Sequence, residues 1–210
     1  MMYYTVKGNI QIQSMPSGIC IKEKKEDAMH SENQLFTGIT CLAGERIILR
    51  KLTPADAAGL KELTEDLEVY RYLPTFLFEK KYADMDHVIN RLYDECLQES
   101  LILGIFLDND FCGLAELYGY QRDAHKLSIG YRLLKRYWGM GIACETVHTL
   151  VNHLFGKTEI QLITASTMAK NLASANVLKK NGFVQSAYVV SEDWGFEQPV
   201  SVDKWQLRRD

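Results

Sequence analysis

The sequence predicts an α/β fold with one mixed, mostly antiparallel central sheet and flanking helices. Three observations predict it. Strand-like runs alternate with segments of helical periodicity over most of the chain. Three of these runs follow one another closely, which is typical of an antiparallel meander. Two later helices each lie between strand-like runs, which indicates a right-handed crossover connection and a mixed sheet.

The first part of this order is one strand, two helices and three strands. Thr53 is a good helix N-cap, Pro54 takes the first helical position, and Asp56 lies three residues after the cap. Apolar residues of the second helix recur every three or four positions. The elements are a strand at 46–50, a helix from 53, a helix at 84–99, and strands at 101–107, 111–120 and 126–134, with a turn at 107–110.

The second part is a helix, a strand, a helix and two strands. The first helix carries an apolar stripe that includes Val147, Leu150 and Leu154, and Gly156 is expected to end it. Asn171 is expected to cap the next helix, which ends at Gly182. The strands are predicted at 160–167, 183–190 and 203–209.

Length, charge and composition limit the classes of protein to which the chain can belong. With 210 residues we expect one main domain at 45–210 and an N-terminal extension at 1–44, which has β-like pieces at 3–13 and 18–21 and could add a hairpin. The net charge of −3 provides no basic field for nucleic acid or a membrane surface. No run approaches the roughly 20 apolar residues of a membrane span, and no secretory leader is visible. Five scattered cysteines favour free thiols in a cytoplasmic protein.

The strongest motif runs from Arg136 to Ala143 (RYWGMGIA), between a strand and an amphipathic helix. Its glycines allow close backbone approach, and the start of the helix favours an anion, so the motif suits a phosphate or pyrophosphate. A dinucleotide fingerprint would need a third glycine where Cys144 stands, and a Walker loop ending at Thr158 would need a glycine at Val151. A plain strand-to-helix turn remains the alternative.

The order SIGYRLLKRYWGMGIACETV, then ITASTMAKNLASANVLKKNGF, resembles the GCN5-related N-acetyltransferase (GNAT) superfamily over residues 45–210. Within it, the match is to the RimJ/RimL type, which acetylates N-terminal amines of ribosomal proteins. The resemblance implies the GNAT fold with splayed strands, and acetyl-CoA as cosubstrate. No metal is implied.

The resemblance also implies the binding residues. The turn of Arg136, Gly139 and Gly141 would hold the pyrophosphate, with the amides from Met140 through Ile142 to Ala143 facing it. The strand from Ile129 through Tyr131 to Leu133 would pair with the pantetheine arm, and an N–H there would face the thioester carbonyl. Asn171 would contact the pantetheine amide, although it could equally be only a helix cap.

Two positions depart from common superfamily patterns. Leu178 stands where many members have a tyrosine that protonates the leaving thiolate; Ser174, shared with RimJ/RimL-type proteins, would serve the sulfur instead or only allow close helix packing. Ser128 stands where relatives commonly have a glutamate base. An alkylamine with a pKa near 10.4 must lose a proton before attack, so Glu116 in the adjacent strand is the best replacement, unless it is only an exposed strand carboxylate.

The predicted function is therefore transfer of an acetyl group to a primary amine, either a protein N-terminus or a small-molecule amine, by direct attack in a ternary complex. The alternative is a CoA-binding module with little catalysis. A covalent route through Cys144 has no visible partner base. We expect residues 65–81 to contribute to the acceptor pocket, no nucleic-acid or membrane partner, and a monomer or homodimer.

Overall fold

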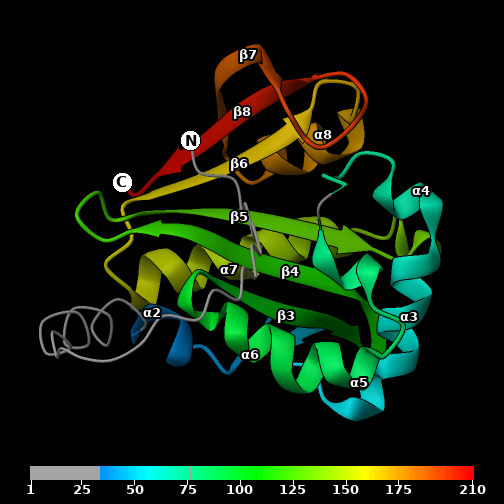
Figure 1. Cartoon of the computed structure of the whole chain (residues 1–210). Helices are drawn as coiled ribbons and strands as arrows, with labels where there is room; N and C mark the ends of the chain where they lie inside the picture. The colour runs from blue at the N-terminus through cyan, green and yellow to red at the C-terminus, as the bar shows by residue number, and fades with distance from the viewer. Residues whose placement is uncertain (1–33, 76) are drawn as a thin grey trace, which may run out of the picture.

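The chain forms one eight-stranded sheet with the strand order β1-β2-β3-β4-β5-β6-β8-β7. The computed structural model describes residues 34–75 and 77–210. Every neighbouring pair of strands is antiparallel except β5 and β6, which run parallel. Helices flank the twisted sheet (Figure 1). The mixed, mostly antiparallel sheet predicted from the sequence is confirmed.

The elements follow the predicted order. The strands are β1 (Cys41–Ala43), β2 (Ile47–Arg50), β3 (Ser100–Leu107), β4 (Asp110–Gln121), β5 (Lys126–Leu133), β6 (Leu162–Met168), β7 (Val184–Glu192) and β8 (Val200–Arg208). The helices are α2 (Gln34–Thr37), α3 (Ala57–Glu65), α4 (Leu67–Tyr70), α5 (Met85–His87), α6 (Tyr93–Glu95), α7 (Ile142–Lys157) and α8 (Leu172–Lys180). Short 3₁₀ turns are η1 (Pro54–Asp56), η2 (Phe78–Lys81), η4 (Cys96–Gln98) and η5 (Lys135–Tyr137), and η3 (Val88–Leu92) is a π-helical stretch.

Two apolar layers cover the two faces of the sheet. Alternate residues of β3 belong to different layers: Leu103 packs in the cluster that includes α7, and Ile102 packs in the cluster that includes α3, α5 and α6. This alternation is what a strand buried on both faces requires. In Figure 1, α7 crosses behind the sheet, and α5 and α6 lie in front of it.

Local signals place the early elements as predicted. The Asp56 carboxylate accepts hydrogen bonds from the Thr53 main-chain N–H (2.8 Å) and from Arg50 Nη1 (2.8 Å), which fixes the start of the first helix against β2. Asp108 and Asn109 have φ of 51° and 72° and join β3 to β4. Two successive left-handed residues are the geometry of a two-residue hairpin turn.

Two helices differ in detail from the predictions. The predicted helix at 84–99 forms as a succession of α5, η3, α6 and η4, with a π-helical stretch that the periodicity did not indicate. The expectation that Gly156 ends α7 is wrong, since the helix continues to Lys157. Side chains end it instead: the Thr158 hydroxyl donates to the Leu154 carbonyl (2.5 Å), and Arg209 Nη2 donates to the same carbonyl (3.1 Å).

The predicted N-terminal extension is described only from residue 34. Residues 34–44 contain α2 and β1, and β1 pairs with β2 in the main sheet. The β-like pieces predicted at 3–13 and 18–21 lie outside the described residues. The predicted boundary at residue 44 therefore falls between two paired strands.

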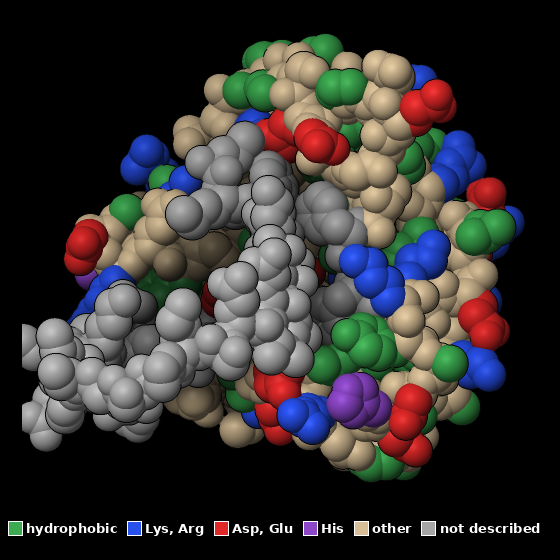
Figure 2. Space-filling model, viewed as in Figure 1, with side chains coloured by type: hydrophobic (Ala, Val, Ile, Leu, Met, Phe, Trp, Pro, Cys, Tyr) green, Lys and Arg blue, Asp and Glu red, His purple; other side chains and the backbone are tan. Residues whose placement is uncertain are grey.

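The surface of the described part is mixed in charge. Figure 2 shows lysine, arginine and carboxylate side chains interspersed over one face. No helix within residues 34–75 and 77–210 is long and apolar enough to cross a membrane. Cys41, Cys96, Cys112 and Cys144 are free thiols.

The most important feature for the site is that β5 and β6 separate. They pair only from Lys126 to Ser128 on β5. Beyond Ser128, β5 continues for five residues to Leu133 and still pairs with β4 on its other side. The two halves of the sheet therefore diverge, which confirms the predicted splayed strands.

Candidate active site

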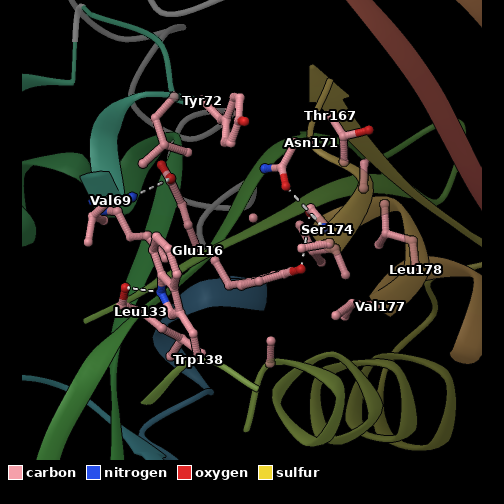
Figure 3. Close-up of a pocket in the computed structure, with 18 of the residues that line it drawn as sticks. Val69, Tyr72, Glu116, Leu133, Trp138, Thr167, Asn171, Ser174, Val177 and Leu178 are labelled. Carbon is pink, nitrogen blue, oxygen red and sulfur yellow. Dashed lines mark hydrogen bonds and ion pairs between the residues drawn. The ribbon is translucent and has the colours of Figure 1, made fainter. Parts of the chain in front are cut away.

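A cleft of about 500 Å³ opens where β5 and β6 separate. Its walls come from α4 and the segment after it, β4, β5, the turn before α7, β6 and α8. Figure 3 shows Glu116 and Trp138 on one side and Asn171, Ser174 and Leu178 on the other. The predicted site residues that line it are Glu116, Ile129, Tyr131, Leu133, Gly139, Gly141, Ile142, Ala143, Asn171 and Ser174.

One end of the cleft is formed by main chain. Gly139 and Gly141 have φ of 75° and 81°, a left-handed conformation that glycine adopts without steric cost. Gly141 is the N-cap of α7 and has no side chain to cap the helix. The first N–H groups of a helix have no acceptor within the helix, so the start of α7 presents donors and a positive dipole end toward the cleft.

An anchor that the sequence analysis missed holds this turn. The Glu145 carboxylate accepts from the main-chain N–H groups of Arg46 (2.5 Å) and Ile47 (3.0 Å), and it pairs with the Arg46 guanidinium (2.8 Å). Arg46 Nη1 also donates to the Met140 carbonyl (3.3 Å). Burial opposes ionisation of Glu145, but these donors outweigh it and lower its pKa. An acidic residue in the first turn of α7 was the only sequence signal.

Two predicted binding residues do not line the cleft. The Arg136 guanidinium pairs with Glu62 at the surface, where both side chains are about half exposed. Met140 is exposed, and its carbonyl faces Arg46. A direct role for either side chain with a phosphate stays a prediction. The positive charge nearest Gly141 comes from Arg46, since a Cβ at Gly141 would lie 3.3 Å from Arg46 Nη2.

Next along the cleft, the open edge of β5 faces the start of α8. The Tyr131 hydroxyl donates to the Ser174 hydroxyl (3.1 Å), and the Ser174 N–H donates to the Asn171 side-chain oxygen (3.2 Å). Burial raises the pKa of Tyr131 to about 12. The predicted helix cap at Asn171 is confirmed, and its amide nitrogen points toward the cleft in Figure 3. Leu178 also lines the cleft and is buried.

Glu116 and Ser128, the two candidate catalytic residues on β4 and β5, have different surroundings. Glu116 lines the cleft, and its carboxylate lies 3.6 Å from Arg132 Nη1. Burial raises the pKa of Glu116; Arg132 opposes this shift and Glu79 reinforces it. Ser128 is not among the lining residues. Its hydroxyl is 2.8 Å from that of Thr164, at the last paired position of β5 and β6.

The other end of the cleft is formed by side chains from distant segments. The Thr75 N–H donates to the Trp194 carbonyl (2.8 Å), which joins the segment after α4 to the loop between β7 and β8. Tyr72 packs against the buried cluster of Met168, Trp194 and Val202. Glu68, Leu73, Pro74 and Leu77 line the cleft here, as expected for residues 65–81. Trp194 was not foreseen.

The histidines named in the sequence analysis lie away from this arrangement, whereas Cys144 lies within it. His125, His148 and His153 do not line the cleft. Cys144 does, and the Asn181 amide nitrogen lies 3.3 Å from its sulfur. Among the described residues, no group of three or more His, Cys, Asp or Glu is placed to hold a metal ion.

The cleft fits the elongated cosubstrate that the sequence resemblance implies. The glycine turn and the start of α7 supply donors for a diphosphate. The edge of β5 from Ile129 to Leu133 lines the cleft and is not paired with β6, so its main chain can bond to the amides of an extended arm.

Comparisons with known proteins agree with this geometry. Residues 46–184 match the family model described as an acetyltransferase (GNAT) domain. The probable N-acetyltransferase YjcK of Bacillus subtilis is 36% identical over 149 residues, which cover 68% of this chain and 82% of that protein. The putative ribosomal N-acetyltransferase YdaF of Bacillus subtilis is 23% identical over 163 residues, with 70% and 82% covered.

Solved structures share the fold. The ribosomal L7/L12 alpha-N-protein acetyltransferase RimL, in complex with coenzyme A, has a TM-score of 0.70 at 16% identity, covering 81% of this chain and 98% of that chain. Spermidine N-acetyltransferase from Vibrio cholerae, in complex with CoA and spermine, has a TM-score of 0.65 at 17% identity, covering 78% and 95%. The predicted resemblance to the GNAT superfamily is confirmed, and proteins named as ribosomal N-acetyltransferases are among the similar ones. The chain belongs to the GNAT family of acetyltransferases.

Proposed function

We propose that the protein transfers the acetyl group of acetyl-CoA directly to a primary amine, either a protein N-terminus or a small-molecule amine, while both substrates are bound. The observation that carries the proposal is the arrangement of the cleft. Glu116 lies on one side and Ser174 on the other (Figure 3), and the hydroxyl of Tyr131, from β5, is hydrogen-bonded to that of Ser174. The transfer needs a proton acceptor for the amine and a donor for the departing sulfur, and these groups supply both.

Glu116 is the proposed base. An alkylammonium with a pKa near 10.4 is almost fully protonated at pH 7, so the attacking nitrogen must lose a proton. A carboxylate whose pKa is raised by burial holds a proton better than an exposed one does. Glu116 takes the proton, becomes neutral, and returns it to solvent, directly or through water.

Ser174 is the proposed partner of the sulfur. The Tyr131 hydroxyl donates to Ser174 Oγ, which leaves the hydroxyl proton of Ser174 available for another acceptor. Since the pKa of Tyr131 is raised to about 12, its hydroxyl stays a donor near neutral pH. Ser174 then stabilises the thiolate as the carbon–sulfur bond breaks, and Leu178 supplies no second acid.

Main-chain groups would orient the donor. The amides after Trp138 would hold the diphosphate, and the open edge of β5 and Asn171 would hold the pantetheine arm. The thioester supplies the acetyl group and a carbonyl oxygen on which negative charge develops. An N–H of β5 facing that oxygen would stabilise the charge in a site shielded from water.

The alternative is a CoA-binding module with little catalysis. The engagement of Ser128 with Thr164 and the apolar Leu178 favour it, because two positions that often carry acid–base groups in the superfamily are inactive here. Glu116 and the Tyr131–Ser174 pair favour the enzyme. A cytoplasmic location, and a monomer or homodimer, remain part of the proposal.

The decisive experiment combines calorimetry with acetyl-CoA and a thiol-release assay over a panel of amines. The panel holds peptides with free N-termini, polyamines and amino acids, with an N-terminally blocked peptide as control. Release of CoA that requires a free amine, together with an acetylated product by mass spectrometry, supports the enzyme. Tight binding of acetyl-CoA without release for any amine supports the module.

A further inference from the structure

Behind the acceptor end of the cleft, three charged side chains form a buried cluster. The Arg132 and Glu79 side chains are 5% and 1% exposed. The Glu116 side chain, which reaches the cleft, is 17% exposed. They come from β5, η2 and β4, segments that are distant in the sequence. The Tyr70 hydroxyl donates to Glu79 Oε1 (3.2 Å) and joins α4 to the same cluster.

The two carboxylates share one guanidinium unequally. Arg132 Nη2 binds Glu79 Oε1 in a direct hydrogen bond. Its Nη1 lies 3.6 Å from Glu116 Oε2, too far for a strong hydrogen bond. Arg132 Nε is buried without a hydrogen-bond partner among the described residues. The positive charge of Arg132 is therefore compensated mainly by Glu79, and it neutralises the negative charge of Glu116 only in part.

The unequal sharing of Arg132 affects how readily the cluster binds a proton. Two ionised carboxylates against one guanidinium leave a net negative charge in a water-poor site, which is unfavourable. The other titratable groups coupled to the cluster are Tyr70, Tyr93 and Cys96. Burial raises the pKa of each, that of Cys96 to about 11, so all three are neutral near pH 7 and add no positive charge. The cluster therefore binds a proton more readily than an isolated carboxylate does, and Glu116 is the carboxylate held less firmly.

We propose that Glu79 is a positioning residue for this reaction: by holding Arg132, it prevents the guanidinium from neutralising Glu116 and keeps Glu116 an effective proton acceptor. This inference rests on the proposed function, in which Glu116 is the base. Glu79 touches neither substrate. Its effect passes through Arg132, because a carboxylate fully paired with arginine is a weaker base than one that is partly paired.

The location of Glu79 links the base to the acceptor wall. Glu79 follows Leu73, Pro74 and Leu77, which line the cleft. The same segment is tied to the opposite wall through Thr75 and Trp194. The segment that an acceptor amine would contact therefore also carries the residue that sets the strength of the base.

The test is Glu79→Gln in the full chain, read first without turnover. Protein labelled with ¹³C at glutamate carboxyls is titrated by NMR, and Glu116→Gln assigns the Glu116 signal. With Glu79 neutral, Arg132 turns to Glu116, and the midpoint of Glu116 is expected to fall by about 1 pH unit or more. Arg132→Met is expected to move it upward. An unchanged midpoint in Glu79→Gln overturns the proposal.

Tyr70→Phe is the matched control. It removes a hydrogen bond to Glu79 in the same segment without changing any charge. We expect it to move the Glu116 midpoint by less than about 0.3 pH unit, well below the shift that a charge change causes. A shift as large as that of Glu79→Gln would assign the effect to general loosening of the segment and overturn the proposal.

Turnover separates this inference from the proposed function. The acid limb of kcat/KM in Glu79→Gln is expected to move to lower pH together with the NMR midpoint. Meanwhile kcat falls by about 3- to 10-fold, because the base is weaker, and KM changes little. A shifted midpoint with an unshifted acid limb overturns the role in catalysis, whereas a wild-type protein that acetylates no amine contradicts the proposed function itself.

Discussion

The two ends of the cleft are formed by different parts of the protein, main-chain groups at one end and side chains at the other. At the end proposed for CoA, the turn with Trp138, Gly139 and Gly141 and the start of α7 line the cleft, and neighbours such as Glu145 hold them in place. At the end proposed for the acceptor, the wall comes from α4 and the segment after it, β4, β5 and the loop between β7 and β8. Main-chain donors suit the part of the ligand that every family member binds, because these donors are present whatever the side chain is. Side chains, in contrast, can be replaced one at a time by substitution.

The difference also separates binding from chemistry. Changes at the CoA end are expected to alter affinity for acetyl-CoA. Changes at the acceptor end are expected to alter the rate and its pH dependence while leaving that affinity intact. The variants below test this division.

The largest effect is expected from Gly141→Trp. Position 141 has φ of 81°, which disfavours any side chain, and a Cβ there would already lie 3.3 Å from Arg46 Nη2. The indole ring would occupy the space in front of the helix start. We expect no measurable acetyl-CoA binding by calorimetry. An unchanged dissociation constant would contradict the assignment of the turn.

Gly156→Ala is the control for that variant. Gly156 lies within α7, and a Cβ there meets nothing within 4 Å. Alanine is the better helix former, so we expect the free energy of unfolding to rise by about 0.5–1 kcal/mol with unchanged acetyl-CoA affinity.

A second, smaller effect is expected from Glu116→Gln. Loss of the base should lower kcat by about 100-fold at pH 7 and leave acetyl-CoA affinity unchanged. In the wild type, the rate should rise with pH through the raised pKa of Glu116, since only the ionised form accepts a proton. The variant should lose this limb. Glu95→Gln, at an exposed carboxylate of α6, is the control, and equal losses in both variants would remove Glu116 from the mechanism.

A third effect concerns the hydroxyl pair of Tyr131 and Ser174. Ser174→Ala is expected to lower kcat by about tenfold, the value of one hydrogen bond to the leaving sulfur. In the proposed mechanism Tyr131 acts through Ser174, so Tyr131→Phe should cost little more in the Ser174→Ala background. Independent, additive losses in this double-mutant cycle would show that the two hydroxyls do not act together.

The smallest effect on binding is expected from Glu145→Gln. The carboxylate holds the turn from behind, so its loss should weaken acetyl-CoA binding by about 3- to 10-fold and destabilise the fold by about 1–2 kcal/mol. The pKa of Glu145 is lowered in the folded state, so its stabilisation is present at neutral pH and is lost as the pH falls below about 4.5.

Thermal unfolding between pH 3 and 7 checks this last prediction. The wild type should lose more stability on acidification than Glu145→Gln does, because glutamine has no proton to gain. Glu65→Gln, at an exposed carboxylate paired with Lys61, should behave as the wild type. Identical acid dependence in Glu145→Gln and the wild type would contradict the anchor.

The same division explains what could be predicted from the sequence. The glycine turn and the cap at Asn171 depend on local chemistry, so they could be read from the residues, whereas the splayed β5 was implied by the family resemblance. Glu79 and Arg132 are 53 positions apart, and their ion pair exists only because η2 packs on β5. Nothing in the sequence near Glu79 distinguishes it from a solvated surface carboxylate.

Arg136 shows the converse. Its place in a phosphate-binding motif predicts a contact with the ligand, which stays a prediction, and in the structure the side chain pairs with Glu62 at the surface. A motif specifies the path of the main chain more reliably than the direction of a long flexible side chain. The same reasoning applies to Arg46, whose position near Gly141 depends on the β1–β2 hairpin and on Glu145.

The short seam between β5 and β6 has a thermodynamic consequence. Only three residue pairs, ending at Ser128 and Thr164 with their linked hydroxyls, join the two halves of the sheet there. A ligand whose amides bond to the unpaired edge of β5 extends that seam as an additional strand would. Bound acetyl-CoA would thus act as an additional strand of the sheet. At a free concentration 100 times its dissociation constant, it would add about 2.7 kcal/mol to the free energy of unfolding.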